Sequence, residues 1–214
     1  MKHITFYLDF ISPFAWLAFH QMPQALAGLS YSVSYKPVLF GAMLQHHGQL
    51  GPAEISAKRD WTYRHVLWLA QSLPVPLQMP ASHPFNPLPL LRLAVACDPA
   101  GQPNRYVCET IFQHVWSGGA NAVDAQRLQA LQDALQPGRD VNGADVKAQL
   151  KAHTDEAIAA QVFGVPSMVV DGRVFWGLDA LPMLADYLRG GAWFQGPDWD
   201  AVTHIPAGIQ RQRP

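Results

Sequence analysis

The stretch FYLDFISPFAWL, residues 6–17, changes its hydrophobic pattern at Ser12-Pro13. Before this pair, apolar side chains alternate with a period of two, as in a β-strand; after it, they recur every three to four residues, as in a helix. Serine is a favoured helix N-cap, and proline suits the first helical position because the N–H there has no partner within the helix. The stretch therefore predicts a strand that leads into a helix with Ser12 at its N-terminus, where anionic groups are also stabilised.

This pattern continues into a second strand. The helix that starts at Pro13 is expected to end near Gly28, and the residues of LSYSVSYKPV, 29–38, alternate again between apolar or aromatic and polar side chains. Two strands separated by a helix of more than ten residues form a βαβ unit, in which the strands are parallel. Residues 1–40 are therefore predicted to be half of an α/β core.

The other half of the core is predicted near the end of the chain, in FGVPSMVVDGRVFWGLDALPMLADYLRGG, residues 163–191. Two short strands flank Asp171-Gly172, a favoured hairpin turn pair, and a helix is expected to open at Asp179 and to end at Gly190-Gly191. The order of strand, helix, strand and then hairpin and helix predicts a thioredoxin-like core.

Helical patterns dominate the region between these halves. Helices are expected at 54–73, 90–96, 106–116, 124–135 and 144–162, with the proline-rich stretch 73–89 running extended. The predicted fold class is thus α/β, a thioredoxin-like core with a large inserted all-helical domain. The expected boundaries are 1–40 and 156–195 for the discontinuous core, 41–155 for the insertion and 196–214 for a C-terminal tail.

Composition excludes several classes of partner. The 214 residues carry a net charge of −1 and no basic run, which argues against nucleic acid and anionic membranes. We expect a cytoplasmic protein, since the sequence has no signal-like segment and no apolar run long enough to cross a bilayer. Cys97 and Cys108 form neither a C-x-x-C pair nor a zinc pattern and are expected to be plain buried thiols. His46 and His47 are adjacent, so their side chains diverge, and no metal site is predicted.

In a thioredoxin-like core, the reactive thiol belongs at the start of the first long helix, where the helix dipole stabilises a thiolate. This sequence has Ser12 there, and serine cannot cycle through a disulfide. Its hydroxyl can cap the helix, or it can donate a hydrogen bond to a thiolate that another molecule supplies, such as glutathione. In the first case Ser12 is a plain helix cap, and in the second it is a catalytic group.

Two later motifs bear on this choice. A proline that heads a strand, as in Val165-Pro166, is either an ordinary trans proline or a cis proline that leaves the backbone of Val165 free to pair with an extended peptide. In the stretch from Trp176 to Asp179, the aspartate is either an N-cap or a carboxylate that holds an ammonium group.

Together, FYLDFISPFAW, FGVPSMVV, FWGLDAL and HPFNPLPLLRLA resemble the 2-hydroxychromene-2-carboxylate isomerases and the kappa-class glutathione transferases, over most of residues 3–190. These families share a disulfide-oxidoreductase-like fold, so the resemblance implies a disulfide-oxidoreductase-like thioredoxin core. The resemblance implies that Ser12 is catalytic and activates the thiol of glutathione, and that Val165, before a cis Pro166, pairs with the cysteinyl backbone. It further implies a homodimer and a γ-glutamyl pocket formed by Trp176, Gly177, Leu178 and Asp179.

For the isomerases, the resemblance implies that glutathione acts as a cofactor in the degradation of naphthalene-like aromatic compounds. The thiolate adds to an unsaturated carbon of the ring-opened form of the substrate, a single bond rotates, and the thiol leaves. On the side of the small aromatic substrate, Asn86 fits a family asparagine, whereas Met43, Ala53 and Glu54 stand where the isomerases have polar and basic contacts. The sequence keeps Lys58 but has His65 and Trp68 where an aspartate and an arginine are common.

Two alternatives remain open. A kappa-like glutathione transferase or peroxidase would use the same glutathione site on a different electrophile. A thioredoxin-like domain without redox activity would instead bind an extended peptide along Val165-Pro166, and it would have no need of Asp179.

Overall fold

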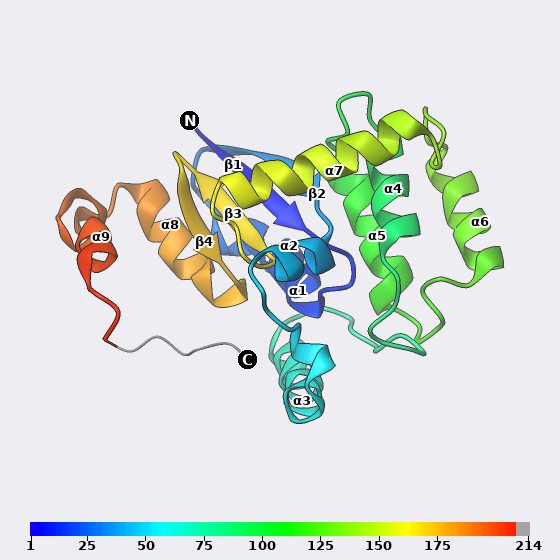
Figure 1. Cartoon of the computed structure of the whole chain (residues 1–214), viewed down its shortest axis with the longest axis horizontal. Helices are drawn as coiled ribbons and strands as arrows, with labels where there is room; N and C mark the ends of the chain where they lie inside the picture. Colours follow the sequence, from blue (N-terminus) through cyan, green and yellow to red (C-terminus); the bar gives the residue numbers. More distant parts are fainter. Residues whose placement is uncertain (209–214) are drawn as a thin grey trace.

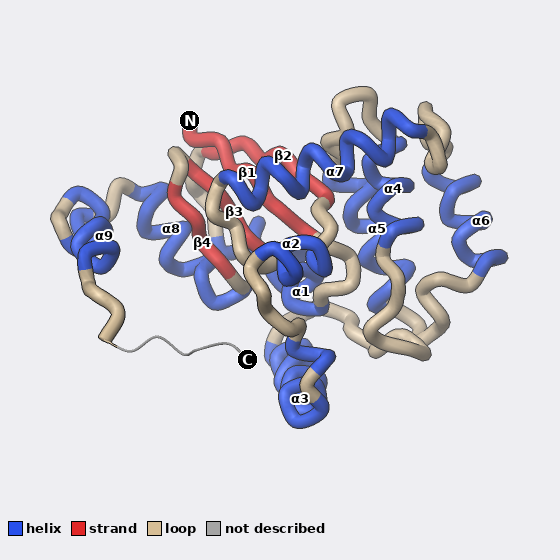
Figure 2. Tube along the Cα trace, in the orientation of Figure 1, coloured by secondary structure: helices blue, strands red, loops and turns tan. Residues whose placement is uncertain are grey.

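A four-stranded mixed sheet lies at the centre of the protein, whose computed structural model describes residues 1–208 (Figures 1 and 2). The strand order is β2-β1-β3-β4, with β1 and β2 parallel and with β3 antiparallel to both β1 and β4. The strands are β1 (Lys2–Leu8), β2 (Tyr31–Pro37), β3 (Ser167–Val170) and β4 (Arg173–Trp176). The parallel pair and the hairpin that the sequence predicts are therefore both present.

Helices cover both faces of this sheet. The side chains of Phe6 and Leu8 are fully buried with residues of α1 (Pro13–Ala25), whereas Tyr7 between them packs in a second, smaller core with Ala157 of α7 (Ala144–Ala159). This division follows from the alternation of side chains along a strand. The helix α8 (Leu181–Arg189) contacts α1, and α2 contacts α7. The result is three layers, with α1 and α8 on one face and α7 crossing the other.

The helical region extends from one end of the sheet (Figure 1). Its helices are α2 (Phe40–His46), α3 (Ser56–Ser72), α4 (Leu88–Ala96), α5 (Arg105–Trp116), α6 (Ala125–Leu135) and α7 (Ala144–Ala159). The long helix α7 packs against both α4 and β2, and so joins this region to the sheet. The expected fold class, a thioredoxin-like α/β core with a helical insertion, is confirmed, while the boundaries at 40 and 156 remain a proposal.

Three local differences from the expected elements have physical causes. The helix α2 is absent from the prediction because seven residues are too few for a clear period. The start of α4 lies two residues earlier than expected, since the side chain of Asn86 accepts a hydrogen bond from the Leu88 N–H. A 3-10 turn, Leu178–Ala180, precedes α8, so Asp179 belongs to this turn and does not cap the helix.

The C-terminal tail packs on the hairpin through aromatic rings. The rings of Phe194 and Trp199 contact Phe175 of β4, and the guanidinium of Arg173 lies over the Trp199 ring at 5.0 Å. The expected tail, 196–214, is therefore partly a packed segment, and residues 209–214 lie outside the described part of the chain.

Candidate active site

Ser12 sits at the N-terminus of α1, where it joins two distant parts of the chain. Its Oγ accepts a hydrogen bond from the Ala15 N–H at 3.2 Å and donates to the Val165 carbonyl oxygen at 3.3 Å. The Val165–Pro166 peptide is cis, and the Pro166 carbonyl accepts a hydrogen bond from the Gly177 N–H at 2.9 Å. The structure thus brings together the three motifs that the sequence singled out.

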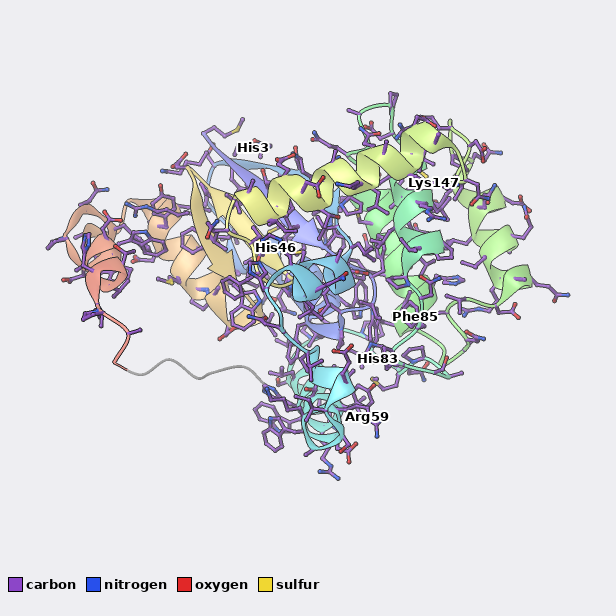
Figure 3. The ribbon with its side chains drawn as sticks, viewed as in Figure 1. His3, His46, Arg59, His83, Phe85 and Lys147 are labelled. Carbon is purple, nitrogen blue, oxygen red and sulfur yellow. The ribbon has the colours of Figure 1, made fainter. Side chains whose placement is uncertain are left out.

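A cavity of about 660 Å³ opens in front of Ser12. Its walls come from the β1–α1 junction, α2, the loop before α3, α3 itself, the segment before α4, the loop before β3 and the end of β4. Most of the lining side chains are apolar or aromatic, among them Phe14, Phe85 and Trp176. In Figure 3, Phe85 and His83 are labelled above α3. Such a cavity suits a small, largely apolar ligand that meets a few polar groups.

Two glycines explain the shape of this site near β4. Trp176 is 53% exposed and lies against Phe163, with 5.0 Å between ring centroids. A Cβ atom on Gly164 would lie 2.6 Å from the Trp176 Nε1, so only glycine lets the indole cross the backbone here. Gly177 has a φ of 98°, and the Asp179 carboxylate occupies the place where its Cβ would be. The spacing W-G-x-D therefore folds the carboxylate of Asp179 back over Gly177.

The remaining predicted glutathione residues lie beside the cavity. Pro166 is buried, Leu178 packs against the main core, and Asp179 is exposed. None of these three residues, nor Gly177, lines the cavity, whereas Ser12, Val165 and Trp176 do. No ion pair involves Asp179 within residues 1–208, so its carboxylate is available to a cation.

Only two of the four predicted substrate residues line the cavity. Ala53 and Glu54 do so, and the Glu54 carboxylate accepts a hydrogen bond from the Gly51 N–H. Met43 is fully buried in the smaller core, because α2 turns this side chain toward α7 and the sheet. Asn86 is exposed and bonds to the start of α4 instead. The expected contacts of Met43 and Asn86 with a substrate therefore have no counterpart in the cavity lining.

Two of the residues that depart from the family pattern, His65 and Trp68, belong to an aromatic row on α3. The ring of His65 lies between those of Trp61 and Trp68, with centroids 6.1 and 6.2 Å away, and it touches the Phe14 ring edge-on. Both tryptophans are well exposed. Because Phe14 lines the cavity, this row continues from the cavity wall to the outer surface.

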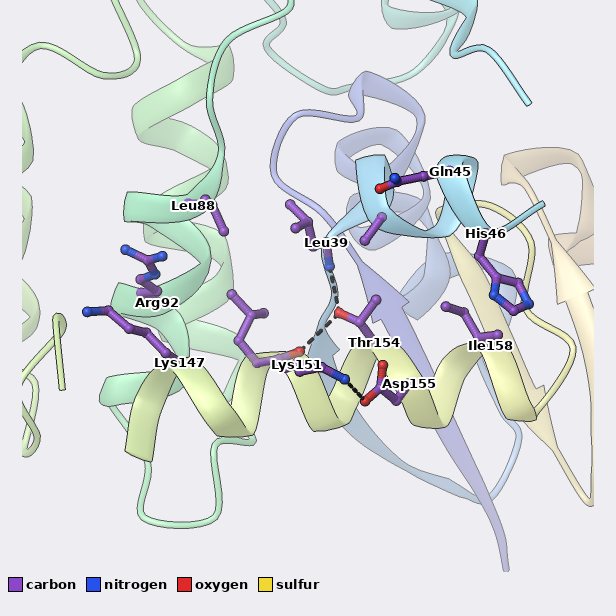
Figure 4. A pocket seen from close by; sticks show the side chains of 12 residues that line it. Leu39, Gln45, His46, Leu88, Arg92, Lys147, Lys151, Thr154, Asp155 and Ile158 are labelled. Atoms are coloured by element: carbon purple, nitrogen blue, oxygen red, sulfur yellow. Dashed lines mark hydrogen bonds and ion pairs between the residues drawn. The ribbon is translucent and has the colours of Figure 1, made fainter. Parts of the chain in front are cut away.

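A second cavity, of about 390 Å³, lies on the other side of α2, between α2, α4 and α7 (Figure 4). Leu39 lines both cavities, and its N–H donates to Thr154 Oγ1 at 3.0 Å. His46 lies at the rim of the second cavity.

No group of three potential metal ligands occurs within residues 1–208. Cys97 and Cys108 are both free thiols, and burial raises the pKa of each. The larger cavity, which contains Ser12, is therefore the candidate active site.

Asp9 supports the β1–α1 loop that carries Ser12, a role that the stretch FYLDFISPFAWL does not indicate. It is fully buried; its Oδ1 accepts from the Ile11 N–H at 3.1 Å and its Oδ2 from the Phe40 N–H at 3.0 Å. The Ser12 N–H also donates to the Asp9 carbonyl oxygen. Burial outweighs these bonds and raises the pKa of the Asp9 carboxyl to about 7. The sequence signal that could have indicated this role is a charged residue, Asp9, within the apolar alternation of a predicted strand.

His83, the first residue of HPFNPLPLLRLA, holds the same loop from the other side, a role that the motif does not indicate. Its Nε2 lies 2.8 Å from the Ile11 carbonyl oxygen, and its Nδ1 lies 2.7 Å from the Tyr63 hydroxyl. The peptide between Ile11 and Ser12 is thus held at its carbonyl by His83 and at its N–H by Asp9. No local pattern places these residues together, since 72 positions separate Ile11 from His83.

The comparisons with known proteins fit this geometry. The model of the DSBA-like thioredoxin domain matches residues 3–189. The chain belongs to the DSBA-like thioredoxin domain family. Within this family, serine at the head of α1 and the absence of any C-x-x-C pair make dithiol exchange at this site impossible for the present chain.

Curated relatives of this DSBA-like chain include two enzyme types. A 2-hydroxychromene-2-carboxylate isomerase from Pseudomonas sp. (strain C18) is 28% identical over 87% of this chain and 90% of that protein. A glutathione S-transferase kappa 2 from Caenorhabditis elegans is 26% identical over 92% and 95%. A solved structure of a 2-hydroxychromene-2-carboxylate isomerase has the same fold, with a TM-score of 0.72, 23% identity and coverage of 92% and 98%. The resemblance inferred from the motifs is thereby confirmed.

None of the helices in residues 1–208 is long and apolar enough to cross a membrane.

Proposed function

We propose that this protein is a glutathione-dependent isomerase of the 2-hydroxychromene-2-carboxylate isomerase type, which acts in the cytoplasm on an intermediate of aromatic-compound degradation. The observation that carries this proposal is the Ser12 hydroxyl, which faces a large apolar cavity from the N-terminus of α1. A serine in this place cannot supply a thiol but can stabilise one. The curated isomerase and kappa-class relatives support both the reaction and the use of glutathione.

Ser12 would activate the glutathione thiol by donating its hydrogen bond to the sulfur. Its present bond to the Val165 carbonyl is 3.3 Å long, at the weak end of the range, so the hydroxyl can turn at small cost. The helix N-terminus adds a favourable potential for the anion. Both effects lower the pKa of a thiol that lies against α1, and more thiolate is then present at neutral pH.

The isomerisation needs no net oxidant or base. In the ring-opened form of the substrate, the thiolate forms a C–S bond to the unsaturated carbon, and the electron pair of the double bond moves to the conjugated carbonyl. Rotation about the resulting single bond follows, and the same electron pair then returns and expels the thiolate. Glutathione is regenerated, and the cavity only has to hold the two ends of the substrate while the bond turns.

Glutathione itself would span from Ser12 to Asp179. The backbone of Val165 would pair with the cysteinyl residue, and Trp176 would lie against the peptide. The carboxylate of Asp179 would hold the γ-glutamyl ammonium, because it is exposed and has no ion pair within residues 1–208. The homodimer implied by the resemblance also remains a prediction.

Replacing Asp179 by alanine should weaken glutathione binding. A lost charge-assisted hydrogen bond is worth about 1 to 3 kcal/mol, so we expect the dissociation constant to rise by about 5- to 150-fold in calorimetry. Asp133→Ala, which removes the same charge from the exposed face of α6, is the matched control and should bind like wild type. Equal affinity of Asp179→Ala and wild type would contradict the ammonium assignment.

A direct assay separates the proposed isomerase from the alternatives. With 2-hydroxychromene-2-carboxylate, an isomerase requires glutathione but does not consume it. A kappa-like transferase, which the kappa-class relatives make the second candidate, would instead accumulate a glutathione conjugate with its own electrophile. A peptide-binding domain would show no glutathione binding in calorimetry, and that result would overturn both enzyme proposals.

A further inference from the structure

Tyr63 and His83 form a polar pair in the wall of the cavity that contains Ser12; Tyr63 lies outside the motifs quoted above, and His83 is the first residue of HPFNPLPLLRLA. Tyr63 lies on α3, and His83 lies in the extended segment before α4. Both line the cavity that contains Ser12. The Tyr63 hydroxyl lies 2.7 Å from the His83 Nδ1 and 2.9 Å from the His83 carbonyl oxygen, and the imidazole is held at its far side by the Ile11 carbonyl.

The donors and acceptors of this pair can be assigned from these contacts. A carbonyl oxygen only accepts, so the His83 Nε2 must carry a proton to approach the Ile11 oxygen at 2.8 Å. In the neutral ring, Nδ1 then has a lone pair, and the Tyr63 O–H must donate to it or share its proton with the His83 carbonyl. Burial lowers the pKa of His83, which favours this neutral form.

The same result holds when the ring is charged. The imidazolium would donate from Nδ1 to the phenol oxygen, and the Tyr63 O–H would then donate to the His83 carbonyl at 2.9 Å. In either state the only proton of the phenol points at His83. Burial also raises the pKa of Tyr63, so this proton stays on the oxygen. Tyr63 therefore offers the cavity a lone pair and no donor.

We propose that Tyr63, polarised and oriented by His83, is the specificity residue of the cavity, and that it accepts a hydrogen bond from a hydroxyl group of the aromatic substrate. This role deepens the proposed function, on which it rests, because it states which polar group of the substrate points toward α3. A carboxylate, carbonyl or ether oxygen at the same place would meet a second lone pair and would be disfavoured. His83 is a positioning residue in this arrangement, since it acts through Tyr63.

The test compares two probes that differ only at this group. One is 4-(2-hydroxyphenyl)but-3-en-2-one, an aryl enone with a phenol, and the other is its methyl ether. Binding of each is measured by tryptophan fluorescence without glutathione, in wild type and in Tyr63→Phe. We expect wild type to prefer the phenol by about 5- to 100-fold, the range for one hydrogen bond to the partly buried Tyr63 oxygen.

In Tyr63→Phe this preference should fall at least fivefold, while any steric penalty of the methyl group remains in both proteins and cancels in the ratio. Tyr106→Phe, on the exposed surface of α5, is the matched control and should keep the wild-type ratio. The same preference in wild type and Tyr63→Phe would overturn the proposal. Because glutathione is absent, a failure of glutathione activation leaves this result unaffected.

A second measurement does not depend on any ligand. The nitrogen chemical shifts of His83 at neutral pH should show a protonated Nε2 and an Nδ1 that accepts a hydrogen bond, and the Nδ1 shift should change in Tyr63→Phe. A ring protonated only at Nδ1 would overturn the donor assignment.

Discussion

Ser12→Ala is expected to reduce glutathione-dependent isomerisation at neutral pH by a factor of about 10² to 10³, the usual effect of removing one hydrogen bond donor to a reacting anion. Glutathione should still bind, because Val165, Trp176 and Asp179 are unchanged. The cause is the thiol pKa, which rises when the Ser12 hydroxyl no longer stabilises the thiolate. Ultraviolet thiolate absorbance of the bound glutathione, followed against pH, measures this directly.

The helix cap must be separated from the catalytic effect. The Ser12 side chain also accepts from the Ala15 N–H, and losing an N-cap destabilises a protein by about 0.5 to 2 kcal/mol. Asn104→Ala, which removes the equivalent cap of α5, is the control for this loss and should leave the thiol titration unchanged. Ser12→Thr keeps a hydroxyl and should retain a lowered thiol pKa. If Ser12→Ala titrates like wild type, Ser12 has no part in thiol activation.

The parts of this site that the sequence predicts are those with a local signal. The Ser12-Pro13 junction marks a change of period, Asp171-Gly172 marks a hairpin, and glycine marks the turn at 177, where φ is 98°. Each of these features follows from the backbone preferences of a few adjacent residues. The fold class then follows, because few topologies join such elements.

The supporting residues could not be predicted in the same way, because their partners are distant in sequence. Asp9 reaches Phe40 across 31 positions, and His83 reaches Ile11 across 72. The family resemblance placed Met43 on the substrate side, but the short helix α2 turns it into the core. Long-range packing therefore decides which polar groups surround Ser12.

The buried Asp9 should make stability fall as pH rises toward neutrality. Its pKa is raised from 3.8 to about 7 in the folded protein. Between these values the folded state holds a proton that the unfolded state has lost, so the free energy of unfolding decreases with pH. The contribution is fully present below about pH 4 and is lost above about pH 7. At about 1.4 kcal/mol per tenfold change in proton affinity, the loss is about 4 kcal/mol at most.

Asp9→Asn removes this titration and should flatten the profile between pH 4 and 7, as measured by urea unfolding at a series of pH values. The asparagine amide has one acceptor oxygen for two backbone donors, Ile11 N–H and Phe40 N–H, so the variant also loses one hydrogen bond at every pH. The slope of the profile, and not its level, is therefore the decisive quantity.

Asp171→Asn is the control: Lys2 lowers the pKa of this exposed carboxyl, so its effect should appear only at acidic pH and with the opposite sign. Parallel slopes for wild type and Asp9→Asn would show that Asp9 ionises in the folded protein as it does in the unfolded chain.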